Sequence, residues 1–238
     1  MNQESLFSIS PLDGRYENAV SALREITSEY GLIKYRYTIE IKWFIHLSKN
    51  SQIKELPKLD IKDYLYLNDL IGNFDIKDAK RVKTIEKKTN HDVKAIEYFI
   101  REKFKKHKKL SKYQEFIHFA CTSEDINNLS YALMIKEAKS ITKAAINETN
   151  KKIKQLANKY KKISMLSRTH GQSASPTTMG KEFANFHHRI NKISLSVDRR
   201  IMTGKINGAV GNYNAHRVAY PEIDWQKISN QFVRSLKL

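Results

Sequence analysis

A single histidine in a short polar segment is the strongest candidate for acid–base chemistry in this chain. His170 lies within Ser167–Gln172 and is followed directly by Gly171. An imidazole that is held still and exposed can exchange a proton near neutral pH. Ser175 as N-cap and Pro176 at the first helical position predict that a helix begins just behind it. A loop histidine satisfied by local hydrogen bonds is the alternative interpretation.

A second candidate is an anion site at the start of another helix. Thr122, Ser123 and Asp125 fit the pattern of a capping box, with a hydroxyl residue followed three positions later by an acid. Capping alone explains this pattern. The same hydroxyls, together with the N–H groups of a helix N-terminus, also attract a carboxylate.

Two further polar segments carry groups that suit phosphate or carboxylate. Asn90, His91 and Asp92 precede an apolar stretch, where Asn90 or Asp92 can cap a helix or Asp92 can orient His91. Arg15 and Tyr16 end a Pro/Asp/Gly turn and offer a phosphate clamp and a hydrogen-bonding ring. The glycine-rich loop 204–213 is weaker evidence, with Lys205 and Asn207 as minor candidates.

The elements that position these residues are predicted to be helices. Apolar residues recur at helical rather than alternating spacing, and the chain has only eight Gly and four Pro. The patterns predict helices over 28–48, 60–70, 76–86, 91–104, 125–161 and 177–202, and a last one from Pro221. We therefore expect an all-α fold, with an N-terminal helical domain over 1–111 and part of a central long-helix bundle over 112–238.

The helix expected over 125–161 sets the architecture. It contains neither Gly nor Pro and would span about 54 Å at about 1.5 Å per residue. A helix of that length exceeds a small domain and favours an elongated bundle shared between several chains. Two long helices cannot close a bundle, so their apolar seams predict that the chain is incomplete or obligately oligomeric.

Composition narrows the classes of function. The formal net charge of +18 suggests nucleic-acid binding, but the lysines are spread over many predicted helices and no recognition motif accompanies them. We favour a lysine-rich surface whose positive field attracts an anionic substrate, with no specific nucleic acid bound. Cys121 is the single cysteine, which fits a reducing, cytoplasmic location.

Three classes of feature are not expected. The sequence contains no run of 18 apolar residues, so we expect no membrane span. No Cys/His cluster has metal-ligand spacing. The first residues, Met1–Ser5, lack the pattern of a secretion signal.

Five segments in order resemble the adenylosuccinate lyase family, within the superfamily of fumarate-releasing lyases. The resemblance covers the chain from about Leu6 to its last residue. The segments that carry it are Ser10–Tyr16, Thr89–Ala95, His118–Asn128, Ser167–Gln172 and Gly204–His216.

The resemblance implies a helical homotetramer whose active sites form where three chains meet. It implies a carbon–nitrogen lyase of purine nucleotide biosynthesis that needs neither cofactor nor metal. Its substrates are nucleotides that carry a succinyl group, and its reaction is β-elimination of fumarate. By the same resemblance, the general acid is His170, and the substrate-binding residues are Arg15, Tyr16, Asn90, His91, Asp92, Thr122 and Ser123.

One departure from the family pattern matters. The family's base is a serine in a Ser-Ser-x-Met-Pro-x-Lys-x-Asn loop, and residues 1–238 contain no such pattern. We therefore expect a fragment that lacks the third signature loop and the C-terminal domain and is inactive by itself. The alternatives are an inactive helical module that joins full-length subunits, a basic nucleic-acid-binding protein, and a superfamily lyase with an argininosuccinate-type substrate.

Overall fold

The computed structural model describes residues 7–238, which form two compact units. Met1–Ser5, the segment without a secretion-signal pattern, lies outside the described residues. The first unit runs to Glu137 and includes Met202–Leu238, and the second is Ala138–Ile201. None of the helices in residues 7–238 is long and apolar enough to cross a membrane. The first unit contains α1 (Ser21–Thr27), α2 (Glu29–Leu47), α3 (Ile61–Gly72), α4 (Ile76–Thr89), α5 (Asp92–Phe104), η2 (Leu110–Phe116), α8 (Asn214–Ala219) and α9 (Trp225–Ser235).

Helix α2 is the centre of the first unit. Ser28 caps it by accepting the N–H of Gly31, and most of its apolar side chains are fully buried, Trp43 and Phe44 among them. Helices α3, α4 and α5 pack around it. The prediction of a buried helix over 28–48 is confirmed, because apolar residues lie on nearly every side and only a few positions, such as Lys42, are exposed.

Two of the shorter helices begin at aspartate caps. Asp60 and Asp75 each form a complete capping box with an aspartate three residues on, which satisfies the free N–H groups at the starts of α3 and α4. The predictions for 60–70, 76–86 and 91–104 are confirmed, although α3 and α4 each run two or three residues further.

The C-terminal part of the first unit differs from its prediction. A short helix, α8, precedes the last helix, and α9 begins at Trp225 rather than at Pro221. Asp224 caps α9 by accepting the N–H of Lys227 at 3.0 Å. Phe232 of α9 then packs edge to face on Trp43, with ring centroids 5.0 Å apart.

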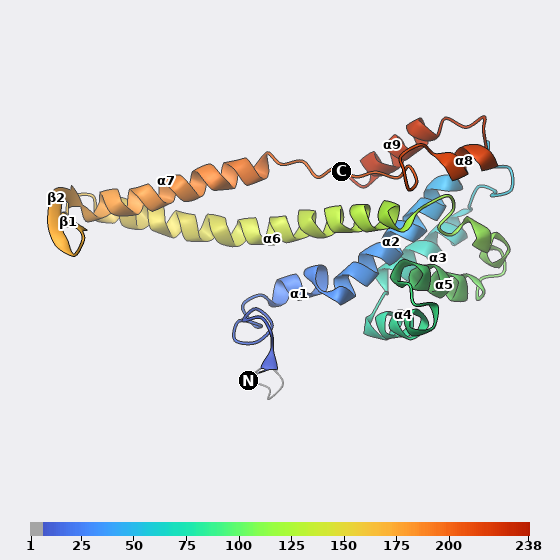
Figure 1. Cartoon of the computed structure of the whole chain (residues 1–238), viewed down its shortest axis with the longest axis horizontal. Helices are drawn as coiled ribbons and strands as arrows, with labels where there is room; N and C mark the ends of the chain where they lie inside the picture. The colour runs from blue at the N-terminus through green and yellow to red at the C-terminus, as the bar shows by residue number, and fades with distance from the viewer. Residues whose placement is uncertain (1–6) are drawn as a thin grey trace. The chain divides into compact units, whose positions relative to one another are not determined.

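The second unit is a helical hairpin closed by two strands, and it contains most of α6 (Ser123–Lys159) together with β1 (Ser164–Thr169), β2 (Gln172–Thr178) and α7 (Met179–Asp198). In Figure 1, α7 runs back alongside α6. The ion pair Lys143–Asp198, at 2.8 Å, and the bond between His187 and Asn150, at 2.8 Å, join the two helices. The all-α fold class is confirmed, as is the helix expected over 125–161.

The predicted start of the second long helix is wrong. Ser175 and Pro176 do not cap α7, because residues 172–178 pair with β1 as an extended antiparallel strand. Proline is compatible with a strand that has a neighbour on one side only. Thr178 is the actual N-cap and accepts the N–H of Lys181 at 3.1 Å, and α7 ends at Asp198 rather than at Met202.

Candidate functional site

The start of α6 is organised around a buried carboxylate. Asp125 is fully buried and accepts the N–H groups of Thr122, Asn207 and Gly208 at 2.9, 3.0 and 3.1 Å. The ammonium of Lys205 lies 2.9 Å from the same carboxylate. The Asp125 carboxylate therefore already accepts the backbone N–H of Thr122. An incoming anion would instead meet the hydroxyls of Thr122 and Ser123.

The glycine-rich loop is bound to α6 by the same residues. The side-chain amide of Asn128 donates to the carbonyl of Lys205 at 3.0 Å and accepts the N–H of Lys205 at 2.8 Å. The ammonium of Lys205 also donates to the carbonyl of Gly208 at 2.8 Å. Lys205 and Asn207, our minor candidates, thus make contacts that hold the loop in place.

His91 is the N-cap of α5, a position for which we had expected Asn90 or Asp92. Its Nδ1 accepts the N–H of Lys94 at 3.0 Å, so the neutral ring carries its proton on Nε2. That Nε2 lies 3.4 Å from the Oγ of Ser123. Asn90 precedes it in the left-handed conformation that ends α4. Two segments predicted to bind substrate therefore meet at His91 and Ser123.

Asp92 binds a different partner from the one we expected. Its carboxylate lies 2.7 Å from the guanidinium of Arg36 and accepts the N–H of Val93 at 2.8 Å. Nδ1 of His91 is 3.8 Å away and already accepts the N–H of Lys94. Burial alone would raise the pKa of Asp92, but the Val93 N–H and the Arg36 guanidinium bring that pKa below its ordinary value.

Arg15 and Tyr16 lie in the turns that precede α1. The guanidinium of Arg15 is 5.5 Å from the centre of the Tyr16 ring, and both side chains are exposed. Within residues 7–238, no hydrogen bond or ion pair joins either residue to His91 or Ser123. The first unit therefore brings together only part of the predicted set.

His170 is at the tip of the β1–β2 hairpin in the second unit. It and Gly171 have φ values of 51° and 76°, and they connect the paired residues Thr169 and Gln172 as a two-residue turn. Hairpin turns of this kind require positive φ at both central positions. The side chain of His170 is exposed. The His-Gly pair at the middle of the segment was the sequence signal for this hairpin.

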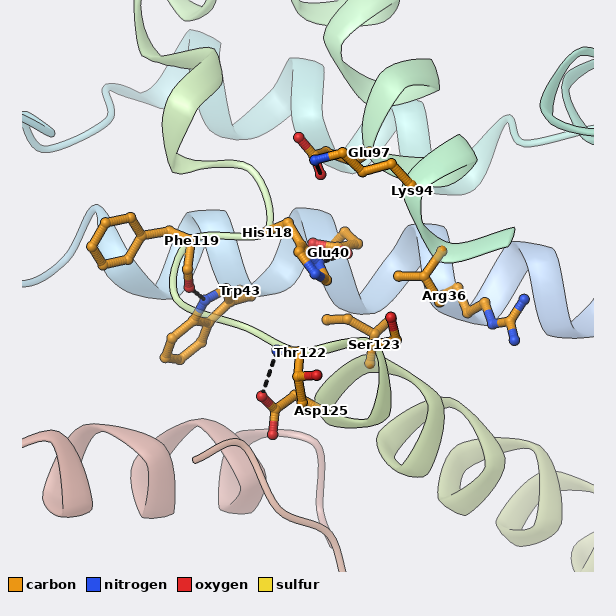
Figure 2. A network of polar contacts seen from close by, with 12 residues as sticks. Arg36, Glu40, Trp43, Lys94, Glu97, His118, Phe119, Thr122, Ser123 and Asp125 are labelled. Carbon is orange, nitrogen blue, oxygen red and sulfur yellow. Dashed lines mark hydrogen bonds and ion pairs between the residues drawn. The ribbon is translucent and has the colours of Figure 1, made fainter. Parts of the chain in front are cut away.

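A polar stripe on α2, formed by Arg36, Glu40 and Trp43, was not predicted (Figure 2). Glu40 is fully buried and its Oε1 lies 2.6 Å from Nδ1 of His118. The indole N–H of Trp43 donates to the carbonyl of Phe119 at 3.1 Å. These contacts hold the segment that leads to Thr122 and Ser123. The available signal was two opposite charges four residues apart, Arg36 and Glu40, in a helix rich in aromatic and aliphatic residues.

The electrostatics of His118 follow from this pairing. Burial alone would lower its pKa, but the Glu40 carboxylate outweighs burial and leaves the pKa of His118 raised. Its backbone has a φ of 59°, and Ala120 has a φ of 58°.

Among residues 7–238, no group of three or more His, Cys, Asp or Glu side chains is placed to hold a metal ion.

Comparisons with known proteins give a consistent picture. The model of a lyase family matches residues 14–237. The chain is 50% identical over 237 residues to the adenylosuccinate lyase of Escherichia coli K12, covering 99% of this chain and 52% of the relative. The adenylosuccinate lyase of Legionella pneumophila Corby is 50% identical over 239 residues, covering 100% of this chain and 52% of its own. The chain thus spans about half the length of the curated relatives it matches.

Solved structures show the same fold at low sequence identity. A fumarate lyase from Mesorhizobium sp. BNC1 matches with a TM-score of 0.73 at 15% identity, over 92% of this chain and 48% of that one. A β-carboxy-cis,cis-muconate cycloisomerase from Acinetobacter calcoaceticus matches with a TM-score of 0.69 at 17% identity, over 92% and 48%. At such identities the likeness concerns the fold alone.

Proposed function

We propose, because the chain belongs to the lyase family, that it is part of an adenylosuccinate lyase. The proposed reaction removes fumarate from adenylosuccinate to leave AMP, and from succinyl-aminoimidazole-carboxamide ribotide in the same way. A base takes the proton beside one carboxylate, the C–N bond breaks as the C=C bond forms, and an acid protonates the departing nitrogen. Identity of 50% over 99% of the chain to an adenylosuccinate lyase supports this choice of substrate.

The observation that carries the proposal is the meeting of His91 and Ser123 at 3.4 Å, although 32 residues separate them in sequence. Each lies at the N-terminus of a helix, where the helix dipole favours an anion. The imidazole Nε2–H and the hydroxyl are both able to donate to one carboxylate. A substrate with two carboxylates and a phosphate suits a site of this chemistry.

The remaining roles are proposals that follow from the family pattern. His170 acts as the general acid, Arg15 and Tyr16 contact the nucleotide, and Thr122 shares a succinyl carboxylate with Ser123. The base comes from a serine loop outside residues 1–238, so these residues need the rest of the enzyme. We further propose that it works in the cytoplasm as a homotetramer, with domains that divide near residue 111.

Fumarate release tests the proposal. The full product of the gene is assayed with adenylosuccinate, alongside a chimera in which residues 1–238 replace the matching half of the E. coli relative. We expect sustained, equimolar release of fumarate and AMP by both, abolished by His170→Gln in each, and none by purified 1–238. A correctly assembled chimera and full product that both leave adenylosuccinate intact would overturn the proposal.

A further inference from the structure

Arg36 is a buried cation in the middle of α2, the helix at the centre of the first unit. Its side chain is 8% exposed, and apart from Glu40 the other buried side chains of α2 are aromatic or aliphatic. A charge in such a place is strongly destabilising unless it is paired and hydrogen-bonded. The partners of Arg36 therefore explain why an arginine is present there.

Those partners belong to two different helices. Nη2 of Arg36 lies 2.7 Å from Oδ2 of Asp92, at the first residue of α5. Its Nε donates to Oδ1 of Asn127 at 2.8 Å, in the first turns of α6 and 91 residues away in sequence. Asp92 directly follows His91, and Asn127 lies one helical turn after Ser123. One guanidinium thus joins the two helix starts that carry the His91–Ser123 pair.

The shape of the guanidinium suits this task. Its planar fork presents donors in fixed directions, so that binding Asp92 with one nitrogen sets where Asn127 can bind another. A lysine offers a point charge on a flexible stem and cannot hold both partners at a fixed separation. Figure 2 shows Arg36 and Glu40 along the same helix, α2.

We infer that Arg36 is a positioning residue that sets the separation between His91 and Ser123, and so determines how tightly a substrate carboxylate is held between them. The inference rests on the proposed function for its substrate, a succinyl nucleotide. The part of the inference that concerns the positions of His91 and Ser123 rests only on the contacts of Arg36 with α5 and α6. Arg36 acts through these two residues and does not itself touch the substrate.

Arg36→Lys in the full gene product tests the inference. We expect KM for adenylosuccinate to rise about tenfold while kcat changes less, because binding to a misplaced pair is weakened throughout the reaction. The effect should shrink to less than about twofold in a Ser123→Ala background, since coupled residues are not additive. Arg81→Lys, at an exposed arginine paired with Glu102, is the matched control and should leave KM unchanged.

Two further measurements keep the test decisive. Asn127→Ala removes one of the two bonds and leaves Arg36 paired with Asp92, so it should also raise KM. This variant tests the inference even if Arg36→Lys fails to fold. Hydrogen exchange reports the geometry without turnover: Arg36→Lys, but not Arg81→Lys, should speed exchange of the amides of Val93, Lys94 and Ala95.

The outcomes separate the two proposals. A wild-type protein that releases no fumarate, together with faster exchange in Arg36→Lys, overturns the proposed function and supports the positioning role. An active wild type in which folded Arg36→Lys matches Arg81→Lys in KM and exchange overturns the positioning role. Equal effects of Arg36→Lys in the wild-type and Ser123→Ala backgrounds also overturn it.

Discussion

The ammonium of Lys205 lies 2.9 Å from the carboxylate of Asp125, which is fully buried at the start of α6. Because three backbone N–H groups bind the same carboxylate, Asp125 joins the glycine-rich loop to the helix that carries Ser123. Asp125→Ala should lower the free energy of unfolding by about 3 kcal/mol, since it leaves several donors and a partly buried cation unpaired.

Chemical denaturation measures this loss, and limited proteolysis within residues 204–213 reports release of the loop. Asp198→Ala, which removes a more exposed ion pair with Lys143, is the control and should cost less than about 1 kcal/mol. Equal losses in the two variants would show that Asp125 has no special role.

The pair formed by the buried Glu40 and the partly buried His118 predicts a dependence of stability on pH. The pKa of His118 is raised above 6.5 in the folded protein, with burial opposing and Glu40 favouring its charged form. A raised pKa means that the folded state holds the proton more tightly than the unfolded state does. This contribution is therefore complete below pH 6.5 and is lost as pH rises through the folded value.

Denaturation at a series of pH values checks this slope. Glu40→Gln should remove the loss of stability at rising pH, because the charged ring no longer has its carboxylate. His188→Gln, at an exposed histidine of α7, should leave the slope as in the wild type. A slope that survives in Glu40→Gln would contradict the assignment to this pair.

Gly180, in the first turn of α7, packs tightly against the end of α6, where its N–H donates to the carbonyl of Tyr160 at 3.0 Å. A Cβ there would lie 2.4 Å from both the carbonyl oxygen of Ala157 and the Cα of Lys161, and backbone atoms cannot move aside as side chains do. Gly180→Ala should therefore destabilise the hairpin of the second unit by about 1–3 kcal/mol.

Gly72→Ala provides the comparison, because its added Cβ meets nothing within 4 Å at the end of α3. That change should be neutral or stabilising by up to about 1 kcal/mol. Thermal unfolding of both variants decides the matter, and similar melting temperatures would rule out a tight contact at Gly180.

The two nitrogens of His91 allow its structural and functional roles to be separated. Nδ1 caps α5, and Nε2 faces Ser123. Asparagine is a good N-cap, so His91→Asn should keep the melting temperature. It lacks a donor in the Nε2 position, and losing a hydrogen bond to a charged carboxylate should lower kcat/KM at least about tenfold.

Steady-state kinetics and thermal unfolding of His91→Asn in the full gene product test this separation. Asp75→Asn, the same kind of cap exchange at α4, should change neither quantity. Full activity in His91→Asn would remove His91 from the site, and a large drop in melting temperature would show that capping needs the ring.

Much of the fold and part of the site were predictable from local sequence. Apolar spacing located α2 and α6, and the ranges expected for α3 and α4 were close to those observed, because helix formation depends on residues within a few positions of one another. The polar segments around His91, Ser123 and His170 also stood out by their composition alone.

Only the tertiary structure decided the features that depend on residues far apart in the sequence. Residues 172–178 are extended because β1 offers hydrogen bonds that outweigh the helix signals of Ser175 and Pro176. Asp92 binds Arg36 rather than His91 because α2 packs a guanidinium beside it. Contacts between residues many tens of positions apart leave no periodic trace in a sequence, so the pairing of His91 with Ser123, and the arginine that sets it, required the folded chain.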